Sequence, residues 1–105
     1  MNLTGMKAVV IGGTSGIGRA LALGLARAGA DVAASSRSHE MVDAIADEIE
    51  SLGVASLRIA SDVCDRDSLV ALRDHVLASF GTVDILINSA GITRRVSTLE
   101  MDEAL

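Results

Sequence analysis

The sequence predicts an α/β fold in which helices cover both faces of a parallel sheet. Short apolar runs rich in branched residues alternate with helical patterns along all 105 residues, the order expected of consecutive strand–helix–strand units. Phe80 is the single aromatic residue, so small and branched side chains must fill the core, and these suit close packing of helices on a sheet. With half of its residues hydrophobic and no linker or repeat, the chain predicts one domain over residues 1–105.

The first strand is expected at Lys7–Ile11, where four apolar residues follow a lysine and precede a glycine-rich turn. A helical pattern begins at Gly18, and Gly29 stands where a left-handed residue would end that helix. Gly12 permits the tight turn, Gly16 lets the main chain approach a phosphate, and Gly18 removes a Cβ that would push helix from strand. The free N–H groups at the helix start would then face an anion.

These three glycines narrow the class of nucleotide-binding loop. A strand followed by a glycine turn and a helix is typical of the Rossmann-type doubly wound sheet. The spacing differs from the common GxGxxG fingerprint, and the sequence contains no GxxxxGK[ST], which argues against a P-loop NTPase. Taken alone, the glycines also fit a strand-to-helix turn that binds no ligand.

The same alternation continues after the first helix. Further strands are expected at Asp31–Ser35, Val54–Ala60 and Asp84–Asn88. Helices are expected between Ser38 and Gly53, between Asp65 and Gly81, and from Ser97, which has capping-box spacing to Glu100. Right-handed crossovers then give the strand order 3-2-1-4, with a nucleotide crevice between the first and fourth strands, where the order reverses.

Composition excludes several classes of function. The net charge of −5, with basic residues scattered apart from Arg94 and Arg95, argues against a nucleic-acid partner. Cys64 is the only cysteine and is expected to be a small buried side chain, so neither a disulfide framework nor a metal site is predicted. The chain has neither a signal-peptide pattern nor an apolar run of about 20 residues, which predicts a cytoplasmic protein without a membrane partner.

Together these motifs make the sequence resemble the short-chain dehydrogenases/reductases over essentially its whole length. Gly12, Gly16 and Gly18 match the TGxxxGxG loop, Asp62 and Val63 match the DV pair beside the adenine, and Asn88, Ala90 and Gly91 match the NNAG turn. With the rest of the loop and the end of the second strand, the expected cofactor-binding residues are Gly12, Thr14, Ser15, Gly16, Ile17, Gly18, Ser36, Arg37, Asp62, Val63, Asn88, Ala90 and Gly91. Asp62 and Asn88 each have a plainer alternative as turn residues.

Two positions depart from the family pattern. Ile11 stands where threonine is usual, and Ser89 replaces the second asparagine of NNAG. These changes affect hydrogen bonds that link the two loops, while the backbone geometry is expected to survive.

Charge at the end of the second strand favours NADP(H) over NAD(H). An NAD enzyme places a carboxylate there for the ribose 2′-OH, but this chain has Ser36 and Arg37 and no acid before Glu40. Arg37 would pair with a 2′-phosphate, although it also fits a solvated surface arginine. Many NADP-type members carry a basic residue where this chain has Ser15; Arg19 could substitute for it or simply cover the helix.

The resemblance implies a catalytic YxxxK pair and a serine, and these are missing here. The sequence has no tyrosine, and its one lysine, Lys7, lies on the first strand. We therefore expect these residues to bind a cofactor without catalysing, as the N-terminal part of a longer oxidoreductase that transfers hydride between nicotinamide and a small carbonyl or secondary alcohol. The complete protein is expected to be a homo-oligomer. The alternative is a non-catalytic NADP(H)-binding regulatory module; Ser36 and Arg37 argue against an S-adenosylmethionine methyltransferase.

Overall fold

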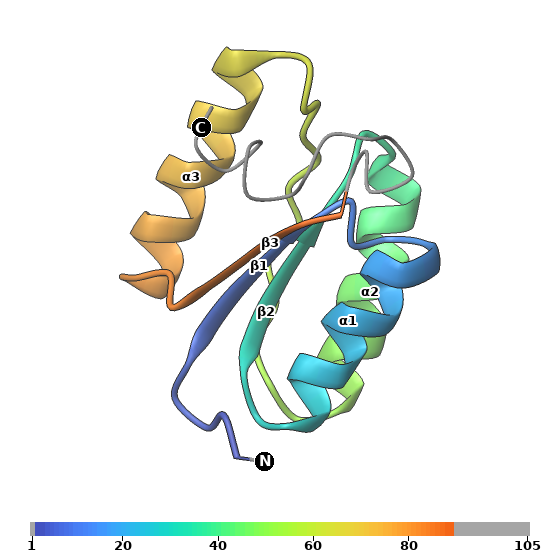
Figure 1. Ribbon diagram of the computed structural model, residues 1–105, viewed down its shortest axis with the longest axis vertical. Helices are drawn as coiled ribbons and strands as arrows, with labels where there is room; N and C mark the ends of the chain where they lie inside the picture. The colour runs from blue at the N-terminus through green and yellow to red at the C-terminus, as the bar shows by residue number, and fades with distance from the viewer. Residues whose placement is uncertain (1, 90–105) are drawn as a thin grey trace.

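The sheet of the computed structural model has three parallel strands in the order β2-β1-β3, within the described residues 2–89. The central strand β1 (Lys7–Ile11) pairs with β2 (Asp31–Ser35) on one side and β3 (Ile85–Asn88) on the other. The registers place Ile11 opposite both Ser35 and Asn88. All three strands therefore end at one edge of the sheet, called the carboxyl edge below (Figure 1).

Helices cover both faces of this sheet, as the sequence predicts. The helices are α1 (Gly16–Arg27), α2 (His39–Ser51) and α3 (Arg66–Phe80). Figure 1 shows α1 and α2 on one side of the strands and α3 on the other. The order of the described elements is that of a doubly wound α/β domain.

The alternation of side chains along β1 divides the core into two layers. Ala8 and Val10 are buried with α1 and α2, whereas Val9 and Ile11 are buried with α3. The α1 side is rich in alanine, with Ala8, Ala22, Ala26, Ala30 and Ala34 all buried in it. Small side chains in that layer allow α1 to lie close to the strands.

The caps predicted from the sequence define the helices. The Ser38 side chain accepts a hydrogen bond from the N–H of Met41 at the start of α2, and Asp65 caps α3. Gly29 follows the end of α1 with φ 104°, and Gly81 ends α3 with φ 82°. These φ values lie in the left-handed region that glycine adopts without strain. The observed α1 begins at Gly16, two residues before the predicted start.

The prediction of a strand at Val54–Ala60 is wrong. This segment joins the sheet through a single isolated bridge between Ser56 and Val32. Between β2 and this segment, serine hydroxyls donate hydrogen bonds to backbone carbonyls. Ser56 Oγ donates to the Val32 carbonyl at 2.7 Å, and Ser35 Oγ donates to the Ile59 carbonyl at 2.5 Å. Side-chain donors therefore replace part of the backbone ladder that would have made a regular strand.

The segment nevertheless lies on the predicted side of β2. Its Arg58 guanidinium forms ion pairs with Asp47 and Glu50 of α2, and these hydrogen bonds raise the pKa of Arg58. The observed order thus follows the predicted 3-2-1-4, with the outermost strand reduced to a bridge. The helix expected from Ser97 lies outside the described residues. Among residues 2–89, no helix is long and apolar enough to span a bilayer.

A salt bridge joins β1 and β2 at the end of the sheet opposite the carboxyl edge. Lys7 Nζ contacts Asp31 Oδ2, and Asp31 Oδ1 accepts from the N–H of Ala55 at 2.8 Å. The hydrogen bond from Lys7 is the main cause that lowers the pKa of Asp31. Both side chains are three-quarters or more buried, so solvent screens this pair less than it screens an exposed one.

We expect Asp31→Asn to lower the free energy of unfolding by about 1 to 2 kcal/mol at neutral pH. Because folding lowers the pKa of Asp31, its contribution is present above the ordinary aspartate pKa and is lost as the pH falls through the lowered value. The difference in free energy of unfolding between the wild type and Asp31→Asn should therefore shrink as the pH falls. Urea unfolding of both proteins between neutral and acid pH measures this difference. Asp74→Asn, in an exposed pair with Arg73, is the control and should change little. If Asp31→Asn lowered the free energy of unfolding equally at every pH, the stabilising role of the ionised Asp31 side chain would be contradicted.

Candidate functional site

The glycine loop follows β1 and turns sharply at the carboxyl edge. Gly12 has φ 79°, which glycine adopts without strain. The N–H groups of Gly12 and Gly13 both donate to the Ser35 carbonyl, at 2.8 and 3.2 Å. These bonds fasten the start of the loop to the end of β2.

The close approach of Gly18 fixes the start of α1 against the loop. A Cβ on Gly18 would lie 2.0 Å from the Gly12 carbonyl oxygen and 2.4 Å from Ser89 Oγ. No side chain could occupy that position without movement of the backbone. The helix therefore begins directly beside the end of β1.

The N-terminus of α1 differs from those of α2 and α3. Ser15 at its N-cap makes no side-chain capping bond, and its first turn contains no acidic residue. The starts of α2 and α3, in contrast, have capping side chains and the acidic residues Glu40 and Asp67. The N–H groups and positive dipole end of α1 therefore stay available to an anion. Next to Ser15, a Cβ on Gly16 would meet nothing within 4 Å among the described residues.

A hollow of about 270 Å³ lies beside this loop, and we call it the edge hollow. It is lined by Ile11, Gly12, Ser36, Arg37, Ser61, Asp62, Val63 and Cys64. The structure thus brings together the predicted residues from the end of β1, the end of β2 and the segment before α3. Thr14 Oγ1 donates to Ser36 Oγ at 2.9 Å, which joins the glycine loop to this lining.

Two arginines considered for phosphate binding have different surroundings. Arg37 is exposed, lines the edge hollow, and has no ion pair or hydrogen bond within residues 2–89. Arg19 instead pairs with Glu48 of α2, and that hydrogen bond raises its pKa. Arg19 therefore joins α1 to α2, while the charge of Arg37 is unpaired within the described structure.

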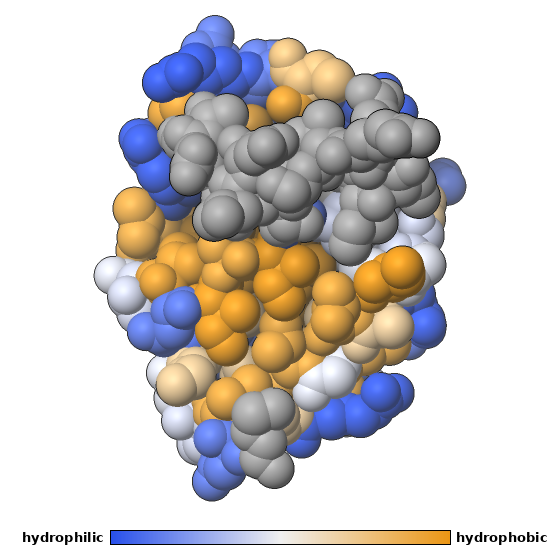
Figure 2. Space-filling model, viewed as in Figure 1, coloured by the Kyte–Doolittle hydropathy of each residue, from blue (hydrophilic) through white to orange (hydrophobic). Residues whose placement is uncertain are grey.

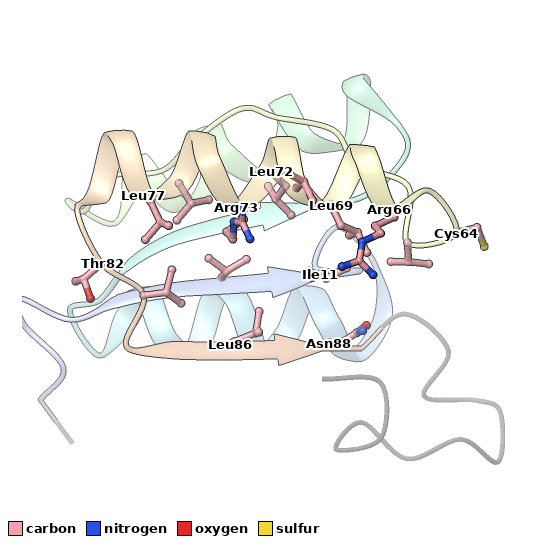
Figure 3. Close-up of a pocket in the computed structure, with 15 residues that line it drawn as sticks. Ile11, Cys64, Arg66, Leu69, Leu72, Arg73, Leu77, Thr82, Leu86 and Asn88 are labelled. Atoms are coloured by element: carbon pink, nitrogen blue, oxygen red, sulfur yellow. The ribbon is translucent and has the colours of Figure 1, made fainter. Parts of the chain in front are cut away.

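The segment at Asp62 makes a turn over the edge hollow. Asp62 Oδ1 accepts from the N–H of Cys64 at 2.9 Å, so its carboxylate serves the turn that was the plainer alternative for this residue. Cys64 is exposed, and the expectation of a buried thiol is wrong. The Cys64 side chain lies on this turn, outside the helix and sheet packing that buries apolar residues (Figure 3).

The end of β3 is the third strand end at the carboxyl edge. Asn88 is buried opposite Ile11. Ser89 Oγ lies 3.0 Å from the carbonyls of both Ile11 and Gly12, and its N–H donates to the Ile11 carbonyl at 2.9 Å. Ser89 therefore links the two loops although it replaces the asparagine of the family pattern. Ala90 and Gly91 lie outside the described residues.

Sequence reasoning missed three residues that shape this edge. A Cβ on Gly13 would lie 2.8 Å from the Val10 carbonyl oxygen and 2.9 Å from the Ala34 Cβ, so this position is also too crowded for a side chain, though less so than Gly18. The adjacent Gly12–Gly13 pair was a signal for such crowding. Ser35 and Ser61 form a buried hydroxyl pair at 2.8 Å, which no local pattern indicates because they lie 26 positions apart.

A second, larger hollow runs between α3 and the strands β1 and β3. This apolar groove has a volume of about 690 Å³, and its lining includes Leu69, Leu72, Leu77 and Leu86 (Figure 3). Figure 2 shows apolar side chains gathered on the face that bears β3. Among the described residues the lining of the groove has no carboxylate or histidine, and its polar members are Cys64, Arg66, Arg73, Thr82 and Asn88. The edge hollow, in contrast, borders the glycine loop through Gly12.

The chemistry available at the carboxyl edge is binding of an anionic, hydroxyl-rich ligand. Backbone N–H groups, the hydroxyls of Ser15 and Ser36, and the Arg37 guanidinium are donors for phosphate and sugar oxygens, while the Thr14 hydroxyl donates to Ser36. Residues 2–89 contain no group of three or more His, Cys, Asp or Glu side chains that could hold a metal ion. The described site therefore supports nucleotide binding.

Comparisons with known proteins agree with this geometry. The family model described as short chain dehydrogenase matches residues 6–105. The 3-oxoacyl-[acyl-carrier-protein] reductase FabG of Staphylococcus aureus (strain N315) is 41% identical over 98 residues, covering 92% of this chain and 40% of its own length. The 2-dehydro-3-deoxy-D-gluconate 5-dehydrogenase of Escherichia coli (strain K12) is 39% identical over 102 residues, covering 97% and 40%.

Solved structures give the same result. L-sorbose reductase from Gluconobacter frateurii, complexed with NADPH and L-sorbose, matches with a TM-score of 0.82 and 38% identity, over 87% of this chain and 35% of that one. A hydroxysteroid dehydrogenase from Escherichia coli matches with a TM-score of 0.80 and 34% identity, over 83% and 37%. The chain thus spans about two fifths of the length of the curated relatives it matches.

The crowding at Gly18 predicts that Gly18→Ala lowers the free energy of unfolding by about 1 to 3 kcal/mol, because the new methyl group would overlap the Gly12 carbonyl. Gly24→Ala is the matched control on the same helix. A Cβ on Gly24 meets nothing within 4 Å, so this substitution should stabilise the protein by about 0.5 to 1 kcal/mol. Chemical unfolding measures both values, and equal effects of the two substitutions would refute the packing argument.

Proposed function

The chain belongs to the short-chain dehydrogenase/reductase family, and from this we propose that it forms the NADP(H)-binding part of an oxidoreductase. The reaction is hydride transfer between the nicotinamide and a small carbonyl compound or secondary alcohol. An exposed free thiol at Cys64 suits the reducing cytoplasm. The complete protein is proposed to be a homo-oligomer, as a property of the family.

The proposed preference for NADP(H) over NAD(H) rests on the charge of Arg37, which is unpaired among the described residues. Arg37 lines the edge hollow immediately after β2 and has no ion-pair partner among the described residues. Ser36 next to it contributes a hydroxyl in place of the carboxylate that would accept from a ribose 2′-OH. A guanidinium and a hydroxyl are suited to a 2′-phosphate, which a carboxylate would repel.

The remaining residues of the edge suit the other parts of the same cofactor. The uncapped start of α1, from Ser15 to Gly18, would hold the pyrophosphate through backbone N–H groups. Asp62 and Val63 would border the adenine, and Asn88 the nicotinamide side, with Ala90 and Gly91 in the following turn. Thr14, hydrogen-bonded to Ser36, would hold the loop against the ribose phosphate position.

Proton transfer must come from groups other than those in this sequence. When bound, NADP(H) supplies or accepts the hydride. General acid–base catalysis needs a titratable group within hydrogen-bond reach of the substrate oxygen, and the family's tyrosine and lysine have no counterpart in these 105 residues. A binding-only regulatory module is the second candidate, since the donors at the carboxyl edge suit binding by themselves. A transcript that encodes YxxxK after Leu105 would exclude it.

Arg37→Gln should weaken NADPH binding about tenfold to a hundredfold and leave NADH binding unchanged, because it removes a charge-assisted bond to the 2′-phosphate. Isothermal titration with both cofactors measures the change. Arg27→Gln removes the same charge at the opposite end of α1 and should alter neither affinity. Equal weakening of NADPH and NADH by Arg37→Gln would show that the guanidinium does not read the 2′-phosphate.

The 105-residue chain should bind NADPH but should not oxidise it with a small ketone. The physical reason is the missing proton donor beside the substrate oxygen. Fluorescence titration measures the binding, and loss of absorbance at the reduced nicotinamide band measures turnover. Turnover by purified chain at a rate above the buffer control would contradict the proposal.

A further inference from the structure

Two buried serines connect the segments that form the edge hollow. Ser35 ends β2 and is 1% exposed, and Ser61 precedes the turn at Asp62 and is 4% exposed. Their hydroxyl oxygens lie 2.8 Å apart, and Ser35 Oγ also lies 2.5 Å from the Ile59 carbonyl oxygen. Both hydroxyls are therefore engaged away from solvent.

The direction of these bonds follows from the supply of hydroxyl protons. A serine hydroxyl has one proton to donate, and that of Ser35 goes to the Ile59 carbonyl. Ser61 must then donate to Ser35 Oγ. The result is a chain of two donated bonds, from Ser61 through Ser35 to Ile59.

Ser35 also binds the glycine loop through its backbone. Its carbonyl accepts from the N–H groups of Gly12 and Gly13, while its hydroxyl binds the 59–61 segment. The Ser61 N–H donates to the Ser36 carbonyl at 2.8 Å, which adds a backbone link at the same level. One residue thus connects the glycine loop to the segment that carries Asp62.

We propose that Ser35 and Ser61 are a positioning pair that sets Arg37 and Asp62 at the separation the adenosine end of the cofactor requires. The inference rests on the proposed function. Arg37 follows Ser35 by two positions and Asp62 follows Ser61 directly, so the bonded pair joins the two chain segments that bring Arg37 and Asp62 into the lining of the edge hollow. Ser61 lines the hollow, but its hydroxyl is bonded to Ser35, so the pair acts through these neighbours.

Few backbone hydrogen bonds join β2 to the 54–60 segment, which explains why side chains hold the two together. Within the described structure, the 54–60 segment has one isolated bridge to β2, at Ser56, and no regular ladder. Its end near the carboxyl edge is held instead by the Ser35 and Ser61 hydroxyls and the Ser61 N–H. Loss of the Ser35 hydroxyl would leave the Ile59 carbonyl and the Ser61 hydroxyl without this partner, whereas loss of the Ser61 hydroxyl would remove only its bond to Ser35. Either loss would free this end of the segment to shift.

The test compares Ser61→Ala with Ser56→Ala in the chain as it exists. Ser56 Oγ donates to the Val32 carbonyl at 2.7 Å, so it joins the same two segments by the same kind of bond but lies away from the edge hollow. Ser61→Ala should weaken NADPH binding about tenfold and NADH binding less, because alignment of Arg37 serves only the 2′-phosphate. Ser56→Ala should lower the urea unfolding midpoint and leave both affinities unchanged.

The outcomes distinguish the positioning role of the two serines from the proposed NADP(H)-binding function. Unchanged NADPH affinity, or an unchanged NADPH-to-NADH ratio, in folded Ser61→Ala overturns the positioning role alone, as does an equal loss in Ser56→Ala. Wild-type chain that binds neither cofactor overturns the proposed function and this inference with it. Ser35→Ala should lose more NADPH affinity than Ser61→Ala because it removes both bonds. If Ser35→Ala does not fold, Ser61→Ala, which keeps the bond to Ile59, still tests the positioning role.

Discussion

The close contact between Gly18 and the Gly12 carbonyl is the constraint on which the rest of the site depends. Because no Cβ intervenes, α1 begins directly beside the end of β1, and its uncapped N–H groups come to the carboxyl edge. A wider separation would leave those N–H groups too far from a ligand lying over the strands. The position of these N–H groups is thus a product of packing between two glycines, and the alanine layer below maintains the same short distance along the helix.

Three elements meet at the carboxyl edge, and serine groups connect them. The carbonyl of Ser35 receives two N–H groups from the glycine loop, and its hydroxyl binds the segment before Asp62. On the other side of β1, Ser89 contacts the carbonyls of Ile11 and Gly12. These links place the end of each strand relative to the loop, while the helices themselves pack on the faces of the sheet.

Local features could be predicted from the sequence because their cause is local. The spacing of glycines identified the loop, and Ser38 and Asp65 identified helix starts through caps that reach only two or three residues. The 54–60 segment was mistaken for a strand because its apolar residues suit one; the hydroxyls that displace the ladder belong partly to β2. The Ser35–Ser61 pair was missed for the same reason, since partners 26 residues apart leave no periodic signal.

The alanine layer between α1 and the sheet has a consequence for mutational tolerance. Ala22 and Ala26 have almost no exposed surface, so a larger residue at either position would force the helix outward. That movement would carry the start of α1 away from the end of β1, so the packing of the helix and the placement of its first N–H groups would change together. Tolerance of substitution in this layer is therefore limited by the geometry of the carboxyl edge as well as by the core, even at residues that lie far from that edge.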